Sequence, residues 1–155
     1  MVEMKHKVLG TVGAPKEQEK KPELPAMTDI DLKSLIELGC VRDSVQIGNL
    51  SFTMRSLNAA EKLLLADLTA PDKTDAELFA FNAKMLAISI ESVNGKPFES
   101  LHPSYAPKMS ESEKTDIKVD LISAMQTPAI AMLLEFYQTI SDRCEAQFTV
   151  EQVKN

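Results

Sequence analysis

Residues 45–54 read Val-Gln-Ile-Gly-Asn-Leu-Ser-Phe-Thr-Met, and this stretch decides which fold the rest of the chain has to support. Apolar and polar side chains alternate on both sides of Gly48-Asn49, which is the period of a strand with one covered face. A two-residue loop that begins with glycine is typical of a II′ or I′ turn. We therefore predict a β-hairpin near residues 43–54. Because a lone hairpin is marginal in water, helices must cover its apolar face.

Signals for helix starts lie on both sides of this hairpin. Thr28 and Thr127 are candidate N-caps, and Thr127 is followed by Pro128 at the first helical position. Three further starts have a capping box, in which a short polar residue stands three positions before Glu: Asn58 with Glu61, Thr74 with Glu77 and Ser110 with Glu113.

The apolar residues indicate how these helices pack. We expect the longest apolar helix over residues 75–93, central and most buried because its apolar side chains cover more than one face. Asn94-Gly95 then ends that helix as a turn. The helix after Asn58 is expected to bury one leucine face, made of Leu63, Leu64, Leu65 and Leu68. The last helix has the same helical spacing at Ile130, Leu133, Leu134, Tyr137, Ile140 and Cys144.

Together these patterns predict a mainly α protein with a small β-hairpin (α+β). Four to five helices form a bundle packed on a two-stranded hairpin, within a single helical domain at residues 28–148. Residues 149–155 are expected to fray. Residues 1–27 are rich in proline, glycine and alternating charges, which predicts a flexible N-terminal arm. In this arm Val8, Leu9 and Val12 form an apolar island that can add an edge strand to a partner.

Composition excludes several classes of partner. The net charge is −6 and no Lys/Arg face is clustered, so nucleic-acid binding is not expected. No window approaches the roughly 18 apolar residues of a membrane span. No apolar run follows the early charges, so a signal peptide is not expected. Cys40 and Cys144 are too few for a disulfide framework and are interpreted as buried free thiols.

Residues able to carry chemistry are few, and they form no motif. His6 and His102 have no metal-ligand spacing around them, and no glycine-rich phosphate loop occurs. A triad of Cys144 with His102 is conceivable only through the fold. The acid pair Glu111/Glu113 fits the capped start of a helix. The pair Asp116/Asp120 fits the solvent-exposed face of that helix, on which Lys114 and Lys118 are also expected. We expect no enzyme, no cofactor and no metal site.

A surplus of apolar helix residues is the remaining candidate for function. Phe79, Met85, Leu86 and Met132 exceed what a simple four-helix packing consumes. Such a surplus indicates either a partner groove or oligomer interface, or a wide core around the central helix.

The order of these elements resembles a family of bacteriophage tail assembly proteins. The resemblance lies in the hairpin at residues 45–54, in Arg-Ser-Leu-Asn-Ala-Ala-Glu at residues 55–61 and in Ile-Ser-Ile-Glu-Ser-Val-Asn-Gly at residues 88–95. Tail assembly chaperones and the related baseplate hub assembly proteins share such a hairpin, a "Leu-Asn/Thr-x-x-Glu" helix start and two C-terminal helices. The similarity spans residues 41–148.

This resemblance implies a non-enzymatic assembly factor that binds tape measure or baseplate hub proteins in the host cell cytoplasm. It also leaves an alternative open, a structural component of the tail or baseplate, resident in the virion and anchored by residues 1–27. Self-association into a homo-oligomer is compatible with both. The candidate partner-binding residues are Val8, Leu9, Val12, Phe79, Met85, Leu86 and Met132.

Overall fold

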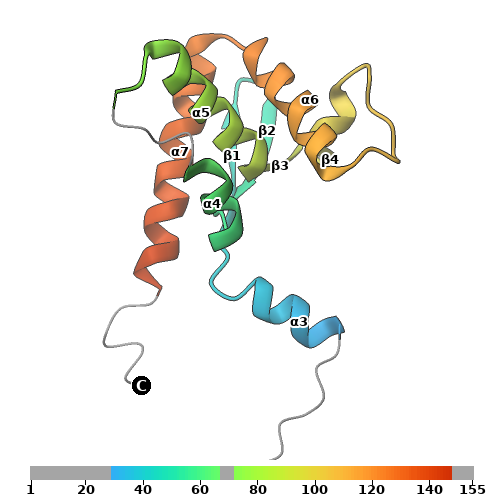
Figure 1. The fold of residues 1–155 in the computed structure, drawn as a ribbon, viewed down its shortest axis with the longest axis vertical. Coiled ribbons are helices and arrows are strands. Elements are labelled where there is room, and N and C mark those ends of the chain that lie inside the picture. The colour runs from blue at the N-terminus through green and yellow to red at the C-terminus, as the bar shows by residue number, and fades with distance from the viewer. Residues whose placement is uncertain (1–28, 67–71, 148–155) are drawn as a thin grey trace, which may run out of the picture. The chain divides into compact units, whose positions relative to one another are not determined.

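The computed structural model describes residues 29–66 and 72–147 (Figure 1). The chain divides into two units, residues 1–36 and residues 37–155. The first unit has one described element, helix α3 (Asp29–Ile36), where the sequence predicted a helix. Its apolar side chains Leu32, Leu35 and Ile36 are exposed. The proposed cap, Thr28, lies outside the described residues, as does the arm formed by residues 1–27.

The second unit contains the predicted hairpin, which is confirmed. Strands β1 (Arg42–Ile47) and β2 (Leu50–Arg55) pair antiparallel, with Ile47 opposite Leu50 at the loop. Gly48 has a φ of 63°, and Asn49 is not among the described residues with positive φ. A positive φ at the first loop residue alone is the requirement of a II′ turn.

The prediction of only two strands is wrong. The described residues form a four-stranded antiparallel sheet in the order β1-β2-β3-β4, with β3 at Ile90–Val93 and β4 at Lys96–Pro97. The helix expected to run to residue 93 ends at Ser89. Asn94 and Gly95 both have positive φ, 51° and 80°, and this pair of values is what a type I′ hairpin turn needs.

Two hydrogen bonds join the β1–β2 hairpin to the β3–β4 hairpin at this turn. The amide of Asn94 donates to the carbonyl of Ser51 at 2.8 Å, and the amide of Ser51 donates to Asn94 Oδ1, also at 2.8 Å. Phe52 stands opposite Val93, and the register shifts between Thr53 and Met54. The segment after α5 therefore becomes a strand because it finds a partner in β2, which local helical spacing does not reveal.

The described part of the second unit has four α-helices, and the first three begin where the capping boxes predicted. They are α4 (Ala59–Ala66), α5 (Asp75–Ser89), α6 (Glu111–Ser123) and α7 (Thr127–Ala146), with a 3₁₀ turn η1 (Phe98–Leu101) before α6. All three boxes form their reciprocal hydrogen bonds. Thr127 is not a cap, because α7 has Gln126 at its N-cap position, without a side-chain hydrogen bond, and Pro128 in its first turn.

The core lies where β2 and β3 meet α5, α6 and α7. Its largest fully buried apolar side chains are Met54, Leu86, Ile90, Ile122, Leu133 and Ile140. Helix α7 packs on β1, β2 and α5, while α6 packs on α5 (Figure 1). No described helix is both long enough and apolar enough to cross a membrane.

The expected leucine face of α4 is wrong, and α5, although central as expected, is buried over only part of its length. Leu63 and Leu64 of α4 are exposed, and Leu65 is the buried residue of that helix; Leu68 lies outside the described residues. Helix α5 buries Leu86 in its second half, whereas Leu78 and Phe79 in its first turns are exposed. Helices α4 and α5 therefore bury less of their apolar surface than their composition suggested.

Replacing Asn94 by alanine should lower the free energy of unfolding by about 2 kcal/mol. The substitution removes the side-chain acceptor for the Ser51 amide, and alanine tolerates positive φ less well than asparagine. Urea unfolding at equal m-value measures this loss. Asn49→Ala in the other two-residue loop is the matched control and should change little. Equal losses for both variants would contradict the role of the I′ turn.

Candidate functional site

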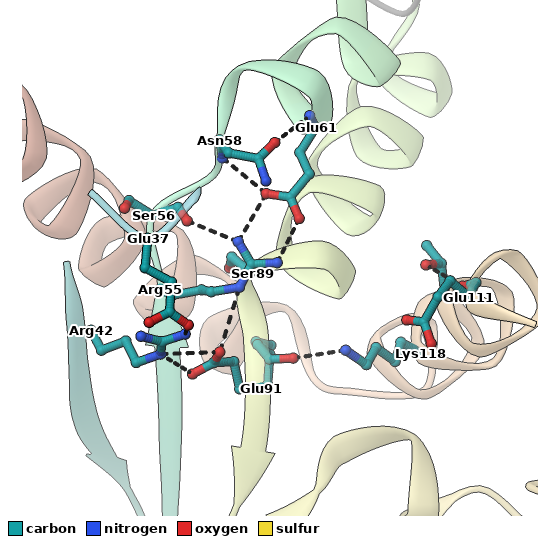
Figure 2. Close-up of polar contacts among 12 residues, drawn as sticks. Glu37, Arg42, Arg55, Ser56, Asn58, Glu61, Ser89, Glu91, Glu111 and Lys118 are labelled. Carbon is teal, nitrogen blue, oxygen red and sulfur yellow. Dashed lines mark hydrogen bonds and ion pairs between the residues drawn. The ribbon is translucent and has the colours of Figure 1, made fainter. Parts of the chain in front are cut away.

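An ion-pair network joins β1, β2 and β3 to the first turn of α4 (Figure 2). The guanidinium of Arg55 holds Glu61 with two hydrogen bonds, Nη1 to Oε2 at 2.8 Å and Nη2 to Oε1 at 2.6 Å. Its Nε lies 3.5 Å from Oε1 of Glu91, whose Oε2 accepts from Arg42 Nε at 2.9 Å. Two parallel bonds fix both distance and orientation of a carboxylate.

Glu61 performs two tasks in this network. Its Oε2 also accepts from the backbone amide of Asn58 at 2.9 Å, as the capping box of α4 requires. Burial by itself would raise the pKa of the Glu61 carboxyl, but the hydrogen bonds from Arg55 and the Asn58 amide outweigh it and the pKa is lowered. The same pairing with Glu61 raises the pKa of Arg55. Both groups therefore stay charged at neutral pH.

The side chain of Lys118 is mostly buried and has a structural role, contrary to the prediction that it is exposed to solvent. Only 15% of its side chain is exposed, and its Nζ donates to the carbonyl of Ile90 at 3.0 Å (Figure 2). The carboxylate of Glu99 lies 3.6 Å from the same Nζ. Burial lowers the pKa of Lys118, against the opposing pull of Glu99. Lys118 thus ties α6 to the start of β3.

A charged groove of about 440 Å³ opens beside this network. It is lined by the end of β2, by α4, by the second half of α5 and by the first half of α6. Its charged lining residues are Arg55, Glu61, Lys84, Glu111, Asp116 and Lys118, and Leu64 and Ile88 supply apolar surface. We call this the α4–α6 groove.

A second groove, of about 260 Å³, lies between the first turns of α5 and α7. Its surface is mostly apolar, and Asp75 is the one charged residue that lines it. The apolar side chains are Leu78, Phe79, Ile130, Ala131 and Leu134. We call this the α5–α7 groove.

The predicted partner-binding residues separate into three groups. Phe79 lines the α5–α7 groove and is exposed, and Met132 is exposed on α7. Met85 packs partly buried against the core, and Leu86 is fully buried within it. The wide-core interpretation therefore accounts for Met85 and Leu86. Val8, Leu9 and Val12 lie outside the described residues.

The described structure gives Cys144 and His102 different hydrogen-bond partners and no contact with each other. The Cys144 thiol donates to the carbonyl of Gly39 at 3.2 Å, whereas Nδ1 of His102 accepts from the amide of Ser104 at 3.1 Å. Asp116 and Asp120 are exposed, and Asp120 lies 3.9 Å from Nε2 of His102. Within residues 29–66 and 72–147, no three His, Cys, Asp or Glu side chains gather as metal ligands would.

Sequence reasoning missed the Arg55–Glu61 pair as a site feature, although the capping box marked Glu61 and the resemblance marked Arg55. No protein-family model, no curated protein and no solved structure matches this chain. The two grooves and the network between the strands and α4 are therefore the features from which function has to be argued.

Replacing Glu61 by glutamine should destabilise the protein by about 1–2 kcal/mol at pH 7, because the charged partner of Arg55 is lost. The folded-state pKa of Glu61 lies below its ordinary value of 4.5. Its contribution to stability is thus present above pH 4.5 and is lost as the pH falls through the folded-state pKa. The difference between wild type and variant should shrink in acid, as measured by urea unfolding from pH 7 to pH 3.

Glu135→Gln is the control for this titration, since Glu135 is exposed and makes no ion pair with any described residue. It should shift stability little at any pH. A difference between wild type and Glu61→Gln that stays constant from pH 7 to pH 3 would show that the carboxylate charge is not its source.

Proposed function

We propose that this chain is a non-enzymatic assembly factor of bacteriophage tails that binds an apolar helix of a tape measure or baseplate hub protein. The observation that carries the proposal is the α5–α7 groove, whose Leu78 and Phe79 are exposed side by side in sequence at the start of α5. The resemblance at residues 45–61 and 88–95 supports the choice of partner.

The lining of the groove fits one face of an amphipathic helix. Such helices dock through apolar side chains at positions i, i+3 or i+4 and i+7, placed into a groove between two helices. Apolar surface is supplied here by both walls, from α5 and from α7. The carboxylate of Asp75 at the rim favours a partner helix that carries a Lys or Arg beside its apolar stripe.

The size of the groove suits temporary binding. The groove has a volume of only about 260 Å³, and interfaces of small area are generally weak and transient. An assembly factor has to release its client when the tail polymerises. A shallow apolar groove covers the client's aggregation-prone face and still allows this release.

Replacing Phe79 by aspartate should reduce co-purification with the client at least fivefold, because a carboxylate would have to be buried on binding. The measurement is co-expression with the tape measure and hub proteins of the phage, followed by affinity capture. Leu101→Asp is the matched control, since Leu101 on η1 is 46% exposed and Phe79 is 41% exposed. Circular dichroism checks that both variants fold.

Three outcomes decide the proposal. Loss of capture with Phe79→Asp but not with Leu101→Asp supports it. Capture of the client by both variants moves binding away from the α5–α7 groove. If the wild-type protein captures neither client and purified virions contain it stoichiometrically, the chain is a resident tail component.

A further inference from the structure

Four of the six charged residues that line the α4–α6 groove are paired within the chain. Arg55 is neutralised by Glu61 and Glu91, and Lys118 lies beside Glu99. Glu111 accepts a hydrogen bond from Lys114 at 2.9 Å. Two lining residues differ: neither Lys84 nor Asp116 makes an ion pair with any residue in the described part of the chain.

Lys84 and Asp116 lie on opposite walls of the same groove. Lys84 belongs to the second half of α5 and is half-buried, and Asp116 belongs to the first half of α6 and is exposed. They carry opposite charges but do not meet within ion-pair distance. The groove therefore presents one cation and one anion that have no partner of opposite charge in the described part of the chain.

Apolar surface adjoins these two charges. Leu63 and Leu64 on α4 are 71% and 64% exposed, and among the large apolar side chains described in the second unit only Leu38 has a comparable value. Leu64 lines the groove, as does the half-buried Ile88. Exposed leucines beside unpaired charges are typical of an interaction surface with an apolar centre and a polar rim.

The mixture of positive and negative residues in the α4–α6 groove indicates which kind of partner binds there. A nucleic acid or a polybasic segment would need a groove of one sign, whereas this groove is lined by three cations and three anions. A two-fold interface uses the same patch on both subunits, so each group must find its complement within that patch. A surface with one free cation and one free anion meets this requirement.

We propose that the α4–α6 groove is the interface of a homodimer with two-fold symmetry. Leu63 and Leu64 of the two copies pack together near the axis. Lys84 of one copy pairs with Asp116 of the partner subunit, and the symmetry repeats the pair on the other side of the axis. This inference does not depend on the proposed function, which uses the α5–α7 groove.

The interface should be weak and dependent on concentration. Helix α4 has eight residues, and interfaces that bury less than about 1,200 Å² in total belong to the transient class. Each copy carries a net charge of −6. At 0.15 M salt the Debye length is about 8 Å, so repulsion between distant charges is screened while close pairs keep their attraction.

Charge reversal tests the pair. Lys84→Glu and Asp116→Lys should each weaken self-association at least tenfold, because each places two like charges across the interface on both sides of the axis. The double variant Lys84→Glu/Asp116→Lys restores opposite charges and should return to within about threefold of the wild type. Sedimentation velocity of the full chain over a concentration series measures this, with circular dichroism as the check of folding.

Lys108→Glu and Asp142→Lys are matched controls, since both residues are exposed and neither lines the groove. Neither should change self-association. The proposal is overturned if the wild type stays monomeric throughout the series, or if it associates and the double variant fails to recover. Loss in the single variants with rescue in the double variant supports the reciprocal pair, because a merely misfolded variant would not be rescued.

Discussion

The fold of the second unit depends on helices that cover the apolar face of β2. This strand lies between β1 and β3, and its Phe52 and Met54 are buried. Full burial of such side chains stabilises a fold by about 1.5–3 kcal/mol each, but two paired strands cannot bury them alone. Leu86 of α5, Ile122 of α6 and Leu133 of α7 complete the same core, and each helix is placed by its contribution to this cover.

Arg55 extends that constraint from the core to the surface. It ends β2 and holds Glu61, which at the same time caps the first turn of α4. One carboxylate therefore fixes the start of α4 to the sheet. The second turn of α4 has only Leu65 in the core, so Leu63 and Leu64 stay on the surface beside the α4–α6 groove. An exposed leucine pair on an anchored short helix is what makes that groove a candidate interface.

Local signals were predictable from the sequence, and pairings over long distances were not. The capping boxes at Asn58, Thr74 and Ser110 depend on residues three positions apart, and all three form. The apolar spacing predicts a helix that continues to Val93, because β-branched residues such as Ile90 and Val93 fit a buried helix or a strand equally well. Pairing with β2 decided between them, and Asn94-Gly95, interpreted only as a helix end, was the missed hairpin signal.

The same limit applies to the candidate sites. Phe79 and Leu86 both belong to the apolar surplus of α5, but one lines a groove and the other fills the core. Composition cannot separate them, since the choice depends on which helices pack against α5. Lys118 was expected on a solvent-exposed face of its helix. Its Nζ instead donates to the carbonyl of Ile90, which is available as an acceptor because the chain leaves the helix and enters β3 there.

Helix α5 relates the two grooves to each other. Asp75, Leu78, Phe79 and Asn82 line the α5–α7 groove at the spacing of one helix face, and Lys84, Ala87 and Ile88 line the α4–α6 groove at the spacing of another. A client in the first groove and a second copy in the other would therefore contact different faces of one helix. A dimer formed through the α4–α6 groove leaves both α5–α7 grooves open. Two weak sites held on one particle would bind a partner with repeated apolar helices more tightly than either site alone, so the proposed dimer would raise the affinity of the α5–α7 groove without enlarging it.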